Sequence, residues 1–161
     1  MTALFDTLFG WFNALYSTYL DTFMLDVVDN NGNLLLSDGY IVIGWIDIVL
    51  SLLVAFSFYI WPLDHPKFKS WWSWLIMAAG NGALNFIVTI CYTNYRIGNA
   101  TQDVIQQVTG VSDGTLDNCI SIGDILGLAF ANVLVSFIFF IVASAILTWF
   151  GNATKYSPLK K

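Results

Sequence analysis

Three long runs of apolar residues dominate the hydrophobic pattern of the chain. They cover residues 40–61, 71–92 and 122–150, and Pro62 and Gly151 end the first and the third. A helix rises about 1.5 Å per residue, so roughly 20 residues cross a hydrocarbon core of about 30 Å. A backbone exposed to lipid has to satisfy its own hydrogen bonds, which favours helices. The pattern therefore predicts an all-α integral membrane protein with three transmembrane helices in a small bundle.

The pattern of residues 3–28 is less regular. Apolar and aromatic residues recur there at helical spacing, namely Leu4, Leu8, Trp11, Leu15 and Tyr19. Asp6, Asn13 and Asp21 interrupt them. We expect one membrane-associated helix, either amphipathic or re-entrant at the interface or crossing as a fourth span, and the carboxylates favour the interface. Residues 29–39 then predict an outer turn or small hairpin around an Asn-Gly pair.

Composition supports a membrane protein and excludes one class of partner. Apolar residues make up 57% of the 161 residues and charged residues 11%, so a soluble domain of this size would lack polar surface. The length predicts a single membrane domain over 1–161, without room for a separate soluble catalytic domain. The formal net charge is −5. An acidic chain has no basic surface for phosphates, so nucleic acid is not expected as a partner.

The few basic residues predict the orientation, because lysine and arginine accumulate in cytoplasmic loops. Lysines lie in the loop 62–70 and in the tail 151–161, which we therefore place in the cytoplasm. The loop 93–121 carries only Arg96 as a base and is placed outside. Aromatic residues at the ends of the runs predict interfacial belts, with Trp61, Trp71, Trp72 and Trp74 on the inner side and Tyr40, Trp45, Tyr92 and Tyr95 on the outer side.

Polar residues inside the apolar runs predict an intramembrane layer. Asp47 lies about two helical turns deep in the first run, and Asn85 and Asn132 lie at a similar depth in the second and third. Asn81 stands one turn from Asn85 on the same face. An aspartate at the centre of a membrane helix costs about 2.5–3.5 kcal/mol on translocon scales, so these side chains are expected to face other helices.

Three interpretations of this polar layer stay open, and the third is a site for a bound lipid or small ligand. In the first, the amides and hydroxyls join the helices, each contact contributing around 0.6 kcal/mol. In the second, Asp47 and the asparagines line a hydrated path for a cation or proton in an oligomer. The first interpretation is favoured, because polar contacts between membrane helices are common.

Small residues at every fourth position predict close contact between helices. Such series are Gly123 with Gly127 and Ala131, Ala78 with Gly82, and Ala79 with Ala83. Three helices offer little area to bury so many small faces. The pattern therefore predicts association with other transmembrane helices, in a homo- or hetero-oligomer.

Cysteine and histidine usage gives little support to chemistry. Cys91 and Cys119 flank the outer loop, and they could form a disulfide if both face outward. His65 is the only histidine and no glutamate is present, so no catalytic residue, metal site or cofactor is predicted. An enzyme acting alone is not expected.

Two functions of different classes follow from the sequence. The first is a non-catalytic small multi-pass subunit or scaffold of a larger membrane assembly. The alternative is a self-associating pore or small ion channel, with the Asp/Asn layer lining its lumen. They differ in what surrounds Asp47, which is packed protein in the first case and water in the second.

Overall fold

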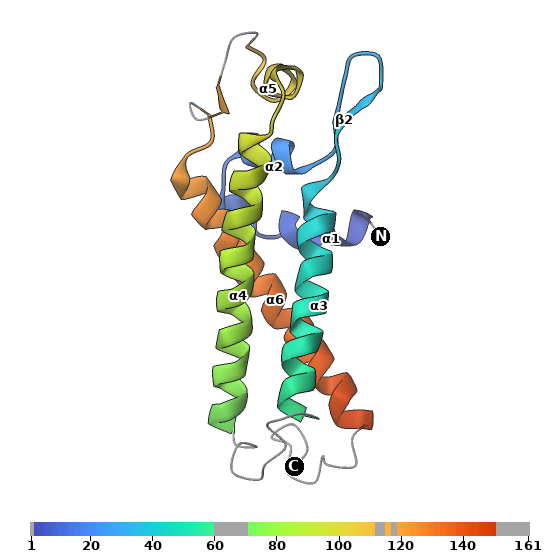
Figure 1. Ribbon diagram of the computed structural model, residues 1–161, viewed down its shortest axis with the longest axis vertical. Coiled ribbons are helices and arrows are strands. Elements are labelled where there is room, and N and C mark those ends of the chain that lie inside the picture. Colours follow the sequence, from blue (N-terminus) through green and yellow to red (C-terminus); the bar gives the residue numbers. More distant parts are fainter. Residues whose placement is uncertain (1, 60–70, 112–114, 117–118, 151–161) are drawn as a thin grey trace. The chain divides into compact units, whose positions relative to one another are not determined.

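The protein is largely helical, which confirms the all-α class (Figure 1). The computed structural model describes residues 2–59, 71–111, 115–116 and 119–150. Three helices are long and apolar enough to cross a membrane, namely α3 (Gly39–Tyr59), α4 (Trp71–Gly98) and α6 (Ile122–Phe150). The predicted cytoplasmic loop 62–70, the tail 151–161 and the end of the first run lie outside the described residues.

The chain packs as two compact units. Unit 1 comprises Met1–Gly44 and Phe86–Asn132, and unit 2 comprises Trp45–Asn85 and Val133–Lys161. Each long helix therefore contributes one end to each unit. Unit 1 also holds the amino-terminal segment, a β-hairpin and the short helix α5 (Gln102–Thr109).

The amino-terminal segment is not the single helix predicted for residues 3–28. It forms α1 (Thr2–Gly10), a 3₁₀ turn (Asn13–Leu15) and α2 (Thr18–Met24). The chain breaks before α2 because Ser17 is extended and its hydroxyl caps the new helix by accepting from the Leu20 amide at 3.3 Å. With nine and seven residues, neither α-helix is long enough to be a fourth span.

The amino-terminal segment has apolar residues on both its exposed and its buried side. The apolar residues Leu4, Trp11, Leu15 and Tyr19 are exposed. A second set of apolar residues forms the interior, namely Phe5, Phe9, Tyr16, Leu20 and Phe23. One apolar side of the segment packs against the rest of unit 1, and the other apolar side is exposed.

Helix α4 is longer than the predicted span 71–92. It continues to Gly98 and measures 28 residues, or about 42 Å at 1.5 Å per residue. No proline or glycine interrupts the turn after Tyr92. The side-chain amide of Asn94 donates to the Ile90 carbonyl at 2.8 Å, and the helix continues through this contact. The loop that the sequence places outside therefore begins after Gly98 rather than at Thr93.

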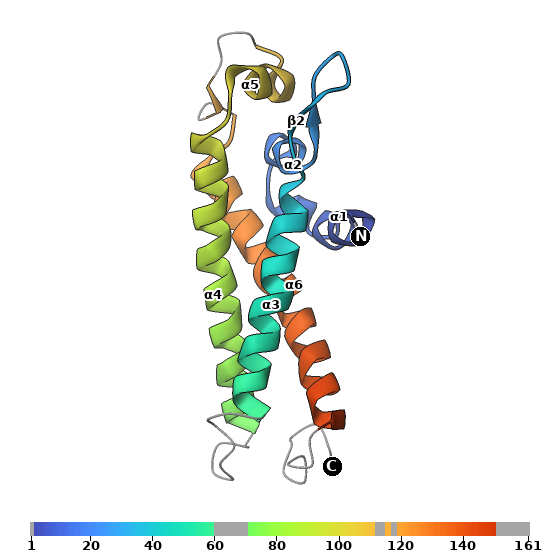
Figure 2. The same ribbon diagram turned by 45° about the vertical axis from the view of Figure 1, so that its right-hand side comes forward.

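A hairpin and α5 cover one end of unit 1 (Figure 2). The strands β1 (Val27–Val28) and β2 (Leu34–Leu36) are antiparallel, and Val27 pairs with Leu36. Gly32 in the connecting turn has φ +81°, which explains a glycine at this position. Helix α5 packs on α2 and on both strands through its buried residues Val104, Ile105 and Val108.

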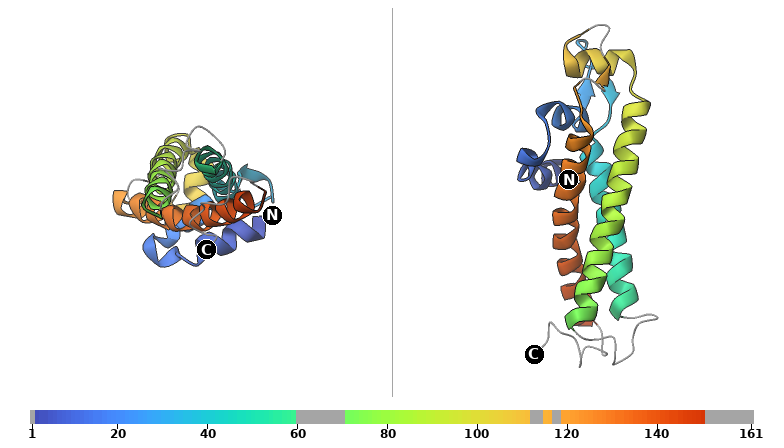
Figure 3. Two further views of the ribbon diagram at one scale, coloured as in Figure 1. Left: turned by 90° about the horizontal axis from the view of Figure 1, so that it is seen from below. Right: turned by 90° about the vertical axis from the view of Figure 1, so that its left-hand side faces the viewer.

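Unit 2 is built from the remaining lengths of α3, α4 and α6, which lie side by side (Figure 3). Its core contains Ala55, Phe58, Tyr59, Trp74, Ala78, Phe140 and Ala143. Trp74 was predicted to belong to an interfacial belt, but it is only 7% exposed and its indole donates to the Ser144 hydroxyl at 3.4 Å. Its ring lies 5.6 Å from that of Phe140, so it is a core residue.

Candidate functional site

The polar residues inside the long helices are buried and hydrogen-bonded. In unit 2 the Asn81 amide nitrogen donates to the Ser51 hydroxyl at 3.0 Å and to the Ser136 carbonyl at 3.3 Å. The Ser51 hydroxyl also donates to the Ser136 carbonyl at 3.4 Å. These three residues are 0% exposed and come from α4, α3 and α6. Asn81 therefore joins all three long helices at one point.

Asn85 and Asp47 lie in the same unit. The Asn85 amide nitrogen donates to the Asn81 carbonyl at 3.1 Å, one turn earlier in α4. Asn85 is 0% exposed and Asp47 is 1% exposed, and both make further interactions inside the protein. The structure thus places Asp47, Asn81 and Asn85 in the interior of unit 2.

Asn132 belongs to the other unit. Its amide nitrogen donates to the Thr89 hydroxyl at 2.6 Å, which joins α6 to α4 within unit 1. Both side chains are at most 1% exposed. The residues predicted to form one layer therefore occupy two units, three in unit 2 and Asn132 in unit 1.

Two of the small residues predicted at helix contacts lie on the inner face of unit 2. Ala78 is fully buried in its core. A Cβ added to Gly82 would lie 3.1 Å from the Val133 side chain and 3.5 Å from that of Phe137. Gly82 therefore allows α4 to approach α6 closely.

The series on α6 has a different environment at each position. Ala131 is 0% exposed in unit 1. A Cβ on Gly127 would overlap the backbone carbonyl of Leu15, so this glycine admits the amino-terminal segment rather than another long helix. A Cβ on Gly123 would meet only the Ser121 hydroxyl in its own turn, at 3.3 Å. The small residues have the predicted spacing, but Gly123 and Gly127 do not face another long helix.

Arg96 is the buried residue that sequence reasoning missed. It is 5% exposed, and its Nη2 donates to the carbonyls of Phe23 at 2.8 Å and Leu25 at 3.3 Å. Its guanidinium also lies 5.3 Å from the centre of the Phe23 ring. These carbonyls end α2, where a cation is favourable to the helix dipole. The sequence feature that could have singled out Arg96 is that it is the only basic residue in a long acidic stretch.

A second polar network holds the amino-terminal segment to α3 and α6. The Tyr40 hydroxyl donates to Asp21 at 2.6 Å and lies 3.2 Å from the Tyr16 hydroxyl. Burial raises the pKa of Tyr16 to about 12, so this phenol is neutral at physiological pH. Asp124 accepts from the Ser17 amide at 3.0 Å and ties the segment to the start of α6.

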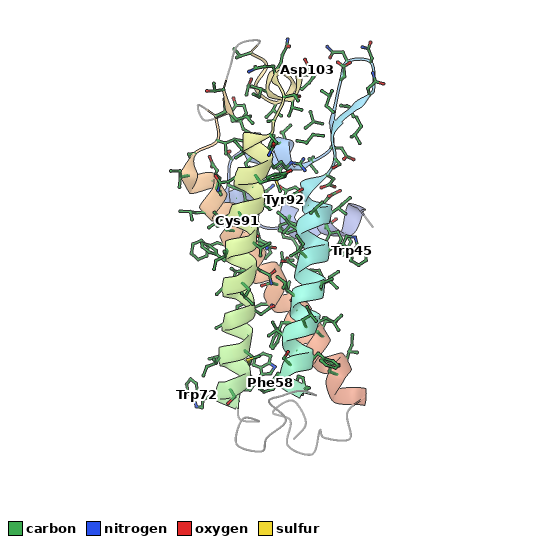
Figure 4. All side chains as sticks on the ribbon, viewed as in Figure 1. Trp45, Phe58, Trp72, Cys91, Tyr92 and Asp103 are labelled. Atoms are coloured by element: carbon green, nitrogen blue, oxygen red, sulfur yellow. The ribbon has the colours of Figure 1, made fainter. Side chains whose placement is uncertain are left out.

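The possible disulfide between Cys91 and Cys119 is not formed in the structure. Cys91 and Cys119 are free thiols, with Cys91 exposed and Cys119 half-buried. Cys91 shares the outward face of α4 with Ile87 and Tyr95, and Figure 4 shows it on this helix. Helix α4 fixes the direction of the Cys91 side chain. Cys119 lies in a turn, and its backbone amide donates to the Leu116 carbonyl.

No group of three or more histidine, cysteine or acidic side chains is placed to hold a metal ion in the described part of the chain. No family of known proteins, no curated protein and no solved structure matches this chain.

Proposed function

We propose that this chain is a non-catalytic, multi-pass subunit or scaffold of a larger membrane protein assembly. The observation that carries the proposal is the direction of its polar side chains. Asn81, Ser51 and Ser136 bond to one another inside unit 2, and Asn132 bonds to Thr89 inside unit 1. Such contacts stabilise helix packing in a membrane, where an unpaired polar group is costly.

The outward faces of the long helices are apolar. Exposed residues include Trp45, Val49, Leu52 and Leu53 on α3, Ile76, Leu84 and Ile87 on α4, and Phe130, Leu134 and Ile141 on α6. Only 33% of the apolar stretch of α3, 33% of that of α4 and 44% of that of α6 is buried within the chain. Lipid or other transmembrane helices have to cover the remainder, which supports a membrane-embedded role.

The α4 helix carries small residues on its outward face that supply a contact surface for another helix. Ala79, Gly80 and Ala83 are exposed, and a Cβ on Gly80 would meet no atom within 4 Å. Small residues at a spacing of three and four let the backbone of a neighbouring helix approach closely. This unused surface favours assembly over a solitary bundle.

The proposed orientation follows the basic residues. Loop 62–70 and the carboxyl terminus face the cytoplasm, and the hairpin and α5 lie outside. Trp72, which is 71% exposed and points away from the neighbouring helices in Figure 4, then anchors α4 at the inner interface. The exposed apolar residues of the amino-terminal segment lie in the outer interface.

The assembly proposal is tested by gentle detergent extraction from the native membrane followed by mass spectrometry. We expect other membrane polypeptides to be recovered with this chain in a constant ratio. Recovery of the chain alone, or only with copies of itself, would contradict a role as subunit of a larger assembly.

The pore alternative makes a separate prediction. Asn81, Asn85 and Ser136 are 0% exposed within a single chain, so a lumen lined by them would require the helices to separate. We therefore expect no ion current from the purified protein in a planar bilayer. A current that is lost in Asp47→Leu would instead support the pore.

A further inference from the structure

The exposed side of the amino-terminal segment is apolar and carries no charge. Its large exposed side chains are Leu4, Trp11, Leu15 and Tyr19, of which Trp11 is the most exposed at 68%. The other exposed residues from 4 to 19 are small or polar without charge. The acids of the segment, Asp6 and Asp21, are half-buried. The exposed side therefore offers a partner apolar surface and no ionic contact.

Contacts with α3 place the segment beside the first turns of that helix. The Phe9 ring stacks on that of Tyr40, with centres 4.9 Å apart and planes at 18°. The Phe5 ring fills the space beside Gly44, where an added Cβ would overlap it. Gly44 lies about 7.5 Å along the helix from Gly39, the first residue of α3, at about 1.5 Å per residue. The 21 residues of α3 match a hydrocarbon core of about 30 Å, so Gly39 lies near the edge of that core.

The contact with α6 gives the same depth independently. A Cβ on Gly127 would overlap the Leu15 carbonyl, so the backbone of the segment touches α6 at this residue. Gly127 lies about 7.5 Å along the helix from Ile122, where α6 begins. Asp124 accepts from the Ser17 amide at 3.0 Å and holds the neighbouring part of the segment. Two helices thus place the segment at one distance from the start of an apolar span.

The direction of α1 fits a position in the membrane interface. Its ribbon runs across the start of α3 rather than along it (Figure 1). Helices that lie in the plane of a membrane bury their apolar face about 5–10 Å into the boundary between headgroups and acyl chains. Tryptophan and tyrosine are enriched at this level, as are Trp11 and Tyr19 on the exposed side of the segment. The depth, the direction and the aromatic residues of the segment therefore agree.

The broken path of the segment favours lipid over a neighbouring helix as its cover. The elements measure nine, three and seven residues, and the extended residues Tyr16 and Ser17 separate the 3₁₀ turn from α2. Leu4 and Tyr19 therefore belong to different helices and form no continuous row. A partner helix packs along a row of side chains at helical spacing. Fluid acyl chains need no such row and cover an irregular apolar surface.

We propose that the amino-terminal segment is an interfacial anchor, whose exposed side is covered by phospholipid acyl chains just below the headgroups around the starts of α3 and α6. The inference rests on the proposed insertion of these helices in a membrane, and not on association with other polypeptides. The segment is fixed to α3 through Phe5 and to α6 through Leu15. The anchor therefore sets the depth at which both helices enter the bilayer.

The accessibility of spin labels on the full chain tests the anchor. A single cysteine is introduced as Leu4→Cys or Trp11→Cys, in a chain whose Cys91 and Cys119 are replaced by serine, and is labelled with a nitroxide. Extraction in polymer-bounded nanodiscs keeps the chain with its native lipids and with any bound polypeptides. Collisions of the label with oxygen, which concentrates among acyl chains, are compared with collisions with a water-soluble nickel chelate.

Two further positions supply the references. Val49→Cys lies on the outward face of α3 within the apolar span, and Asp103→Cys lies on the exposed face of α5. We expect the ratio of oxygen to nickel collisions at Leu4→Cys and Trp11→Cys to be several-fold higher than at Asp103→Cys. It should stay below the ratio at Val49→Cys, because the anchor lies nearer to the headgroups.

A ratio at either segment position equal to that at Asp103→Cys would place the segment in water and overturn the anchor. Protection of either label from both reagents would show that protein covers the segment, which overturns the anchor as well. The Val49→Cys label separates these outcomes from a failure of the proposed function. Free access of nickel to this label would overturn the membrane insertion of α3 itself, whereas a high oxygen ratio there confines the failure to the anchor.

Discussion

At the scale of single residues, helical spacing predicted which side chains face inward, but not what they contact. Asn81, Asn85 and Thr89 follow one another at four-residue intervals and are all 0% exposed. The partners of Asn81 and Thr89 come from other helices, and spacing within one helix carries no information about the relative rotation of another. The Ser51 and Ser136 contacts of Asn81 therefore had to come from the structure.

Removal of the Asn81 side chain should destabilise the protein. Asn81→Ala loses hydrogen bonds to Ser51 and Ser136, and at about 0.6 kcal/mol for each contact we expect a loss of roughly 1 kcal/mol. Reversible unfolding in mixed micelles measures the change. Asn94→Ala is the matched control, because Asn94 is exposed on the same helix and bonds only to its own turn. Equal effects of the two substitutions would contradict the inward role of Asn81.

Gly127 should tolerate substitution less well than Gly80. Gly127→Ala drives a methyl group into the Leu15 carbonyl, and we expect a cost of about 1–3 kcal/mol from the backbone shift. Gly80→Ala meets no neighbouring atom and should be neutral or stabilising, since alanine favours a helix. Thermal unfolding of both variants in one detergent compares them, and a neutral Gly127→Ala would show that the segment does not pack there.

At the scale of elements, the long apolar helices were predictable and the amino-terminal segment was not. Length and hydropathy identify a candidate membrane span largely by themselves, as in α3 and α6. The break at Ser17 and the turn of the segment onto α3 and α6 depend on distant partners, including Asp124 and Gly127. A helical pattern that is apolar on two sides does not indicate which side packs inward.

Arg96 should stabilise the helix α2. In Arg96→Met the carbonyls of Phe23 and Leu25 lose a charged donor, and hydrogen bonds to charged groups contribute about 1.5–3 kcal/mol. We expect faster amide exchange in residues 18–24, with α6 unchanged. Arg96→Lys should be intermediate, because lysine keeps the charge but not the planar fork. Unchanged exchange in Arg96→Met would show that the guanidinium does not hold α2.

At the scale of the whole molecule, basic residues predict a side of the membrane for each loop. A single cysteine at Asp103→Cys, with Cys91 and Cys119 replaced by serine, places a thiol on the exposed face of α5. We expect a membrane-impermeant maleimide to label it on intact cells. Labelling only after permeabilisation would reverse the proposed orientation.

The sequence predicts a class of function and nothing finer, and that class remains a proposal. Asp47 and the asparagines indicated polar helix contacts, and their inward direction now supports packing as the main role of this layer. The identity of a partner is not encoded in the pattern of one chain, because an outward apolar face fits lipid and protein alike. Partner choice depends on complementarity with a second surface.

The central claim, that this chain is a subunit of a larger membrane assembly, is tested most directly by native mass spectrometry of the complex extracted in mild detergent. Wild type and Gly80→Leu are compared, with Ile87→Leu as a control on the outward face of the same helix. We predict that wild type and the control stay bound to other polypeptides, while Gly80→Leu releases the free chain without unfolding. A wild-type chain recovered alone, or only with copies of itself, would contradict the account.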